Sequence, residues 1–176
     1  MNLRGFIIFL FIILFSFPIF AQNLSSVDPD EIKAAFIYNF LKFVTWPNDD
    51  SNSKDFLFCV VGETSLLPYL LDLNGQELNN KPLKVIKLPF GNPKLTKCRA
   101  IFIGKLKKSD QEKLFKKISQ KPILTISDKP GFTEKGGIIE IFLKQDRFRF
   151  KVNLSTARKV HLFISSRLLR LAEEVL

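Results

Sequence analysis

Five residues near the end of the chain have side chains suited to binding an anion. They are Arg158, His161, Ser165, Arg167 and Arg170. The first arginine and the histidine are three residues apart, as are the last two arginines, and residues at this spacing share one face of a helix. Arginine presents a planar fork of donors that fits a carboxylate or a phosphate. The five residues are therefore candidate contacts for an anionic ligand or an acidic partner surface. Surface ion pairs with Glu173 or Glu174 are the alternative.

Patterns of known enzymes are missing from the sequence. His161 is the only histidine and lies in an apolar stretch, and no G-x-S-x-G motif supplies a nucleophilic serine. Neither a G-x-G-x-x-G motif nor a P-loop follows any expected strand. The acidic residues Glu134, Glu140 and Asp146 are scattered over a loop and a hairpin instead of converging. The sequence therefore predicts a protein that is not an enzyme and needs no cofactor.

The two cysteines, Cys59 and Cys98, favour a disulfide. An even number of cysteines in an exported chain is typical of a disulfide, and 39 positions separate these two, unlike the C-x-x-C of thiol oxidoreductases. Two thiolates and a single histidine do not supply the four ligands of a structural zinc site. On the loop-entropy model the bridge contributes about 3 to 4 kcal/mol.

The aromatic residues of the first expected helix form a second candidate contact surface. The run comprises Phe36, Tyr38, Phe40, Phe43 and Trp46. Some of these side chains could bind a partner. The favoured interpretation is that the phenylalanines belong to the core and that Trp46 is a lid over them.

The beginning of the chain resembles a cleaved secretory signal. Arg4 precedes an apolar run over residues 6–15, which is too short to span a membrane, and the small residue Ala21 precedes a polar stretch. We expect cleavage after Ala21, which leaves one domain over residues 22–176 outside the cytoplasm. Residue 22 is Gln, so a lipid anchor would have no cysteine to accept it.

Positive charge is concentrated in one segment. The chain has 27 basic and 17 acidic residues; removal of residues 1–21 takes away one basic residue, which leaves 26 minus 17, or +9. Residues 81–121 contain 13 Lys or Arg and only two acidic residues. Export argues against nucleic acid as the partner. An acidic partner, an anionic lipid or envelope polymer, and a solvated basic face remain open.

Strand and helix signals alternate through the middle of the chain. Short apolar or alternating runs predict strands over 56–61, 83–88, 99–104, 122–127, 138–143 and 147–152. Capping residues predict helices over 28–44, 64–71, 109–118, 153–160 and 165–175. The predicted class is α/β: one domain with a mixed, mostly parallel sheet of about six strands, helices on both faces and a C-terminal antiparallel hairpin.

Three details of the helices can be checked. The first helix should begin at the cap Asp28 and bury the face formed by Ile32, Ala35, Phe36, Asn39, Phe40 and Phe43. The helix near residue 110 should begin with a capping box from Ser109 to Glu112. The last helix should dock on the core through Leu168, Leu171, Ala172 and Val175.

Four parts of the sequence together resemble the YfiR-like family of periplasmic regulatory proteins. They are residues 32–47 (IKAAFIYNF and then FVTWP), 59–62 (CVVG), 127–139 and 152–172, which ends with ISSRLLRLA. The resemblance implies a non-catalytic periplasmic domain, a redox-sensitive disulfide and a homodimer. It also implies that the protein restrains a membrane-bound diguanylate cyclase, or another membrane sensor, through the periplasmic region of that protein. Cyclic-di-GMP and biofilm formation would fall, and an envelope lipoprotein could act as the antagonist.

Two other functions remain open at this point. The chain could be a ligand-binding sensory module that feeds a histidine kinase, with Arg158, His161 and Arg170 holding a small anion. It could also bind an anionic envelope polymer through residues 81–121, and such binding would fall steeply with salt.

Overall fold

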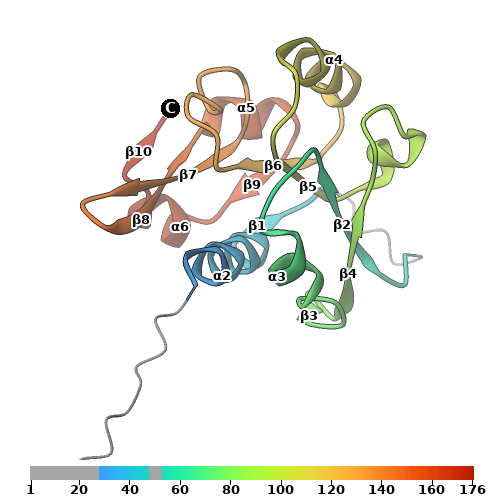
Figure 1. Cartoon of the computed structure of the whole chain (residues 1–176), viewed down its shortest axis with the longest axis horizontal. Coiled ribbons are helices and arrows are strands. Elements are labelled where there is room, and N and C mark those ends of the chain that lie inside the picture. Colours follow the sequence, from blue (N-terminus) through green and yellow to red (C-terminus); the bar gives the residue numbers. More distant parts are fainter. Residues whose placement is uncertain (1–27, 48–52) are drawn as a thin grey trace, which may run out of the picture.

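The computed structural model describes residues 28–47 and 53–176, which form an eight-stranded sheet with helices packed against it (Figure 1). The expected signal over residues 1–21 and part of the loop after Pro47 lie outside the described residues. The helices are α2 (Pro29–Lys42), α3 (Leu67–Leu71), the 3₁₀ helix η1 (Pro93–Lys97), α4 (Lys108–Ile118), α5 (Leu154–Lys159) and α6 (Ser166–Leu171). The strands are β1 (Val44–Thr45), β2 (Phe56–Val61), β3 (Glu77–Leu78), β4 (Lys81–Lys87), β5 (Ala100–Ile103), β6 (Leu124–Ser127), β7 (Ile139–Lys144), β8 (Arg147–Val152), β9 (Phe163–Ile164) and β10 (Glu174–Val175).

The sheet has the strand order β10-β8-β7-β6-β5-β2-β4-β3. The five strands β4, β2, β5, β6 and β7 run parallel, while β7 and β8 form the predicted antiparallel hairpin. All six expected strands are present, but the expected number of strands was wrong, because β3 and β10 extend the two edges. Each of these edge strands has two residues, too few to show a period of two in the sequence. Two more short strands, β1 and β9, pair separately.

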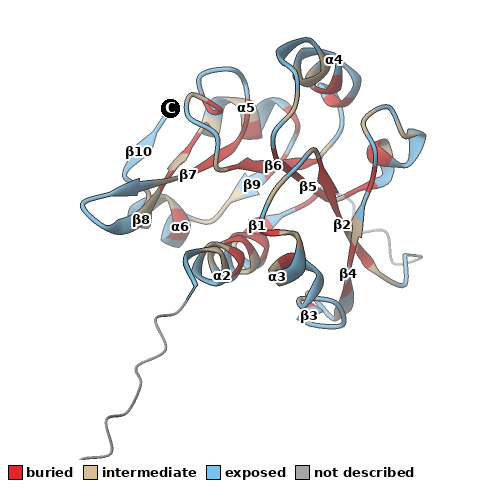
Figure 2. Cartoon of the chain, in the orientation of Figure 1, coloured by how far each residue is buried: buried red, intermediate tan, exposed pale blue. Residues whose placement is uncertain are grey.

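Alternation along β2 divides the core between the two faces of the sheet. Phe58 and Val60 belong to the larger apolar cluster, which includes residues of α2, α3 and α6. Cys59 and Val61 belong to a second cluster, which includes Leu114 of α4. Figure 1 shows α4 on one side of the sheet and α2, α3 and α6 on the other. Both faces of the central strands are buried, as Figure 2 shows, which explains their continuously apolar sequences.

Helix α2 begins as predicted but turns a different face to the core. The Asp28 carboxylate accepts a hydrogen bond from the Asp30 amide at 2.8 Å, and Pro29 occupies the first helical position. The buried residues are Ala34, Ile37, Phe40 and Leu41. The prediction that Ile32, Ala35 and Asn39 face the core was wrong, because the packing of α2 against α3 and β8 selects a neighbouring stripe that is equally apolar. Phe36 and Phe43 pack at the margin of this stripe, partly exposed.

Helix α4 begins two residues earlier than expected. Its N-cap is Lys107, whose side chain makes no capping hydrogen bond, so the predicted capping box of Ser109 and Glu112 was wrong. The amides of Asp110 and Gln111 both donate to the carbonyl oxygen of Lys107 at 3.0 Å, which places Ser109 inside the first turn. The lysines of the outer face are exposed, whereas Leu114 and Ile118 are buried, as the amphipathic pattern predicts.

The C-terminal segment is a short helix followed by a strand. Ser165 caps α6 as expected, and Leu168 is buried. The prediction that Leu171 and Val175 dock on the core was wrong, because the helix ends at Leu171 and the chain continues as β10 beside β8. Leu171 is 66% exposed and Val175 is 44% exposed. Within the two described ranges, no helix is both long and apolar enough to cross a membrane.

Candidate functional site

A hollow of about 630 Å³ lies at the amino ends of β5 and β6. Because these strands are parallel, the segments that lead into them meet at one edge of the sheet. The residues that line the hollow include Pro47, Lys97, Cys98, Arg99, Lys121 and His161. We call this region the amino-edge hollow. It brings the only histidine together with basic residues from the segment 81–121.

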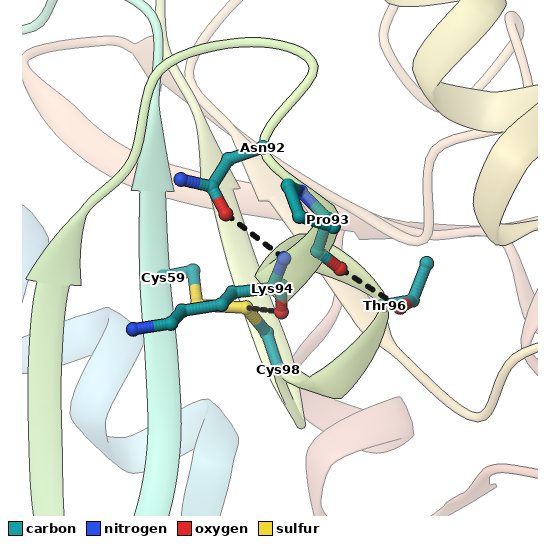
Figure 3. The surroundings of a disulfide bond; sticks show 6 residues. All are labelled: Cys59, Asn92, Pro93, Lys94, Thr96 and Cys98. Carbon is teal, nitrogen blue, oxygen red and sulfur yellow. Dashed lines mark hydrogen bonds between the residues drawn. A yellow bond between two sulfur atoms is a disulfide. The ribbon is translucent and has the colours of Figure 1, made fainter.

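The predicted disulfide anchors the wall of the amino-edge hollow to which Cys98 belongs. Cys59 in β2 and Cys98 after η1 are bonded, with their Cα atoms 6.0 Å apart (Figure 3). Both cysteines are buried. Helix η1 is itself closed by its N-cap, since the Asn92 side chain accepts a hydrogen bond from the Lys94 amide at 2.9 Å. The disulfide therefore fixes η1, and with it Lys97, against the central strand of the sheet.

Trp46 supports the amino-edge hollow from inside the core. Its ring is 6% exposed and packs edge-on against Phe56, with the ring centroids 4.9 Å apart. Its indole N–H donates a hydrogen bond to the carbonyl oxygen of Arg99 at 2.9 Å. The structure thus buries Trp46 within the core beside Phe56, so the interpretation of Trp46 as a lid over Phe36, Phe40 and Phe43 was wrong. The hydrogen bond fixes the chain immediately before β5.

His161 is exposed and has an unusual backbone conformation. Its φ is 59°, in the left-handed region that glycine occupies most easily. The His161 amide donates to the carbonyl of Arg158 at 3.0 Å, and the Leu162 amide donates to the carbonyl of Ala157 at 2.9 Å. This is the Schellman motif that ends α5, in which the left-handed residue is usually glycine. A histidine at this position costs stability, so its side chain is a candidate for a role beyond folding.

The other predicted contact residues do not line the amino-edge hollow. Arg158 is exposed near the end of α5, and Arg167 and Arg170 are exposed on α6. Ser165 is a structural residue: its hydroxyl accepts a hydrogen bond from the Arg167 amide, and its own amide donates to the carbonyl of Phe43 at 2.9 Å. The structure therefore assigns His161 to the hollow and leaves the arginines on the neighbouring surface.

The two C-terminal glutamates pair with lysines and arginine of the hairpin. Glu173 pairs with Lys144 and, at 3.9 Å, with Arg149. The Lys144 ammonium donates a hydrogen bond to Glu173 and lowers the pKa of that carboxyl. Glu174 lies 3.1 Å from the Lys151 ammonium. These pairs differ from the alternative considered for the sequence, in which the glutamates would pair with the C-terminal arginines.

A family model described as YfiR/HmsC-like matches residues 30–173. The chain belongs to the YfiR/HmsC-like family. The match extends from α2 to the end of α6 and includes both cysteines, Trp46 and His161. The amino-edge hollow is therefore built entirely from residues of the family domain.

In this YfiR/HmsC-like protein, sequence reasoning missed a buried carboxylate beside the carboxyl end of β6, at the opposite ends of the strands from the amino-edge hollow. Glu140 in β7 is 4% exposed. Its side chain accepts hydrogen bonds from the amides of Gly131, Phe132 and Thr133 at 3.3, 2.8 and 3.2 Å. The hydroxyl of Thr133 donates a further hydrogen bond at 3.2 Å. The signal was available, because Glu140 interrupts the apolar run Ile138 to Phe142.

An ionic cluster at the same edge connects α2 to the end of β6. The Lys33 ammonium lies 2.7 Å from Asp30 and 3.2 Å from Asp128. Burial opposes the charge on Asp30, but hydrogen bonds from Lys33 and Ser65 outweigh it and lower the pKa of Asp30. Burial likewise opposes the charge on Lys33, yet the two carboxylates raise the pKa of Lys33. In the described part of the chain, no three His, Cys, Asp or Glu side chains gather to hold a metal ion.

Proposed function

We propose that this protein is a periplasmic regulator that binds the periplasmic sensory region of a membrane diguanylate cyclase and restrains its activity. The observation that carries the proposal is membership of the YfiR/HmsC-like family over residues 30–173. The protein would act by binding, without catalysis. Lower cyclic-di-GMP and reduced biofilm formation would follow from this binding.

The ends of the two central strands support a function in binding at the protein surface instead of catalysis at the sheet. Open α/β sheets usually bind substrates where the chain reverses direction across the sheet, here at the carboxyl ends of β2 and β5. At this point Glu63 and Lys105 exchange backbone hydrogen bonds of 3.2 and 2.7 Å. A Cβ atom at Gly104 would lie 2.4 Å from the Glu63 carbonyl oxygen. Main chain therefore bridges the ends of β2 and β5 and holds them close together at this point.

The segment from His161 to Leu171 is the surface that we assign to the partner. Phe163 is 68% exposed, and Arg167 and Arg170 lie on the helix that follows. Exposed aromatic and arginine side chains are the residues that most often dominate protein interfaces. Phe163 is held in place because β9 pairs with β1, which follows directly after α2. The surface thus combines an exposed aromatic side chain with arginines and is preorganised.

The proposed mechanism is a shift of populations in the cyclase. Suppose that this protein binds the inactive conformation of the sensory region more tightly than the active one. At saturation, the ratio of active to inactive cyclase then falls by the factor by which the two affinities differ. An envelope component that sequesters this protein, such as a lipoprotein, would release the cyclase. No contact with the catalytic domain in the cytoplasm is required.

The test is binding of the purified protein to the purified periplasmic region of the cyclase, together with cyclic-di-GMP measured in cells. We expect Phe163→Asp to weaken binding by about tenfold or more and to raise cyclic-di-GMP. Leu143→Asp is the matched control, because Leu143 is also 61% exposed but lies in the hairpin strand β7. Equal effects of the two substitutions, or no binding by the unmodified protein, would refute the proposal.

A further inference from the structure

A second basic hollow, of about 450 Å³, lies at the carboxyl ends of β5 and β6. Four lysines line it: Lys105 after β5, Lys108 in the first turn of α4, and Lys129 and Lys135 in the loop between β6 and β7. We call it the carboxyl-edge hollow. We infer that it binds a small phosphate ester that carries an apolar group. This site is independent of the partner surface proposed above.

The main chain fixes the wall that carries Lys105. Its amide and carbonyl groups form the two hydrogen bonds with Glu63 described above, and the Gly104 amide donates to the carbonyl of Val61 at 2.8 Å. This wall is therefore an extension of the two central strands, β2 and β5. A ligand that binds here meets a backbone that is already ordered, so little conformational entropy is lost on binding.

The opposite wall is fixed by the buried carboxylate. Glu140 binds the three successive amides from Gly131 to Thr133, which lie between the two lysines of the loop. The Lys135 ammonium lies 3.5 Å from the carbonyl oxygen of Pro130, so its side chain folds back across this turn. Burial of a carboxylate is costly unless it is fully hydrogen-bonded. Here it holds a loop that carries two of the lysines lining the hollow.

An aromatic pair joins the two sides of the hollow. Phe115 of α4 lines the hollow and packs on Phe132 of the loop, with their ring centroids 5.6 Å apart. Phe132 lies directly over Gly137, where a Cβ atom would be 2.1 Å from its ring. Leu106 adds a second apolar side chain to the lining. The ligand therefore meets a partly exposed aromatic surface beside the lysines.

Charge decides the class of ligand. Four lysines line the hollow, against the lining carboxylate Glu112 and the Asp128 carboxylate 3.3 Å from the Lys129 ammonium, so the charge is 4 minus 2, or +2. A phosphate monoester carries about −1.5 to −2 near neutral pH, and lysine binds phosphate as a point charge. Helix α4 starts at this hollow without a side-chain cap, and the positive end of its dipole adds to the attraction for an anion. An aromatic or aliphatic substituent on the phosphate would pack against Phe115.

The test is isothermal titration of the purified protein with phenyl phosphate at low ionic strength. We expect phenyl phosphate to bind about tenfold more tightly than inorganic phosphate, because only the ester has an apolar group, and we expect no binding of phenol. The substitution pair Lys108→Gln and Lys135→Gln should weaken binding by about tenfold or more. The control pair Lys113→Gln and Lys116→Gln removes the same charge from exposed positions of α4 and should change binding by less than about twofold.

Two outcomes overturn the inference: no binding of phenyl phosphate at millimolar concentration, or equal weakening by the two pairs of substitutions. Vesicles of phosphatidylglycerol, compared with phosphatidylcholine, identify the source of the phosphate. The protein could co-sediment with the phosphatidylglycerol vesicles and lose this binding only when Lys108 and Lys135 are replaced. That result would identify a lipid headgroup as the ligand of this site. Phe163→Asp should leave binding of phenyl phosphate unchanged, which separates this site from the proposed partner surface.

Discussion

Positive charge lines both the amino ends and the carboxyl ends of the parallel strands, which we call the amino edge and the carboxyl edge. Different interactions hold the two in shape. At the amino edge, a covalent bond between Cys59 and Cys98 fixes η1 and the lysine at its end. At the carboxyl edge, hydrogen bonds to Glu140 fix a loop that carries two lysines. A disulfide depends on an oxidising compartment, whereas a buried hydrogen-bond network depends on the exclusion of water.

Because different interactions hold them, the two hollows can be disturbed separately. A reductant breaks the disulfide and leaves the hydrogen bonds that Glu140 accepts intact. Substitution of Glu140 acts on the loop and leaves η1 bonded to β2. Hydrogen exchange should therefore locate reductant effects near residues 93–98 and the effects of Glu140 near residues 128–137. Overlapping patterns of exchange would show that the two edges are coupled.

The largest effect should come from Glu140→Ala. The substitution leaves three amides without their acceptor in a buried site and removes one of the two acceptors of the Thr133 hydroxyl, and we expect the free energy of unfolding to fall by about 3 to 5 kcal/mol. Urea denaturation measures this change. The control is Glu134→Ala in the same loop, where an exposed carboxylate is removed at a cost below about 1 kcal/mol. Similar losses for the two variants would contradict the role that we assign to Glu140.

Removal of the disulfide should have the next largest effect. Replacement of both Cys59 and Cys98 by alanine should lower the free energy of unfolding by about 3 to 4 kcal/mol, because the bond closes a loop of 39 positions. Urea denaturation of the variant and of the reduced native protein should give similar midpoints. A loss below about 1 kcal/mol would mean that the amino edge is held mainly by Trp46 and the core.

A glycine at position 161 should stabilise the protein. His161→Gly relieves the left-handed backbone of a side chain, and we expect a gain of up to about 1 kcal/mol in the free energy of unfolding. Thermal unfolding measures the gain, with His161→Ala as a control that removes the imidazole but keeps the strain. If the imidazole contributes to the partner surface, the glycine variant should be more stable and bind the cyclase region less well.

The smallest effect concerns the dependence of stability on pH. The pKa of Asp30 lies below its ordinary value of 3.8 in the folded protein, so its contribution is present above pH 3.8 and is lost as the pH falls through the folded pKa. The pKa of Lys33 is raised above 10.5, so its contribution is present below pH 10.5 and is lost as the pH rises through the folded pKa. Asp30→Asn should flatten the acid limb of a stability curve from urea melts, while Asp72→Asn on the surface should not. An unchanged acid limb would mean that the ion pair of Asp30 and Lys33 does not stabilise the folded protein.

Much of the fold could be predicted because its signals are local. The central strands are buried on both faces and so have continuously apolar sequences, and the caps Asp28, Asn153 and Ser165 each bond an amide two or three residues ahead. The face that α2 buries was not predictable, since Ile37 and Phe36 are equally apolar and only packing against other elements selects between them. The two-residue strands at the sheet edges depend on pairing with distant residues and have no local signal.

The class of fold, the six expected strands and the pair of cysteines that could bond were predictable, because they depend on composition and on neighbouring residues. The distribution of positive charge over the surface depended on how the strands are arranged in space. The basic segment 81–121 looks like one patch in the sequence, but β5 carries the chain from one edge of the sheet to the other. Lys97 and Lys121 therefore lie at the amino edge, while Lys105 and Lys108 lie at the carboxyl edge. A parallel sheet sorts residues by the end of the strand at which they fall, which is why one charged segment became two separate hollows.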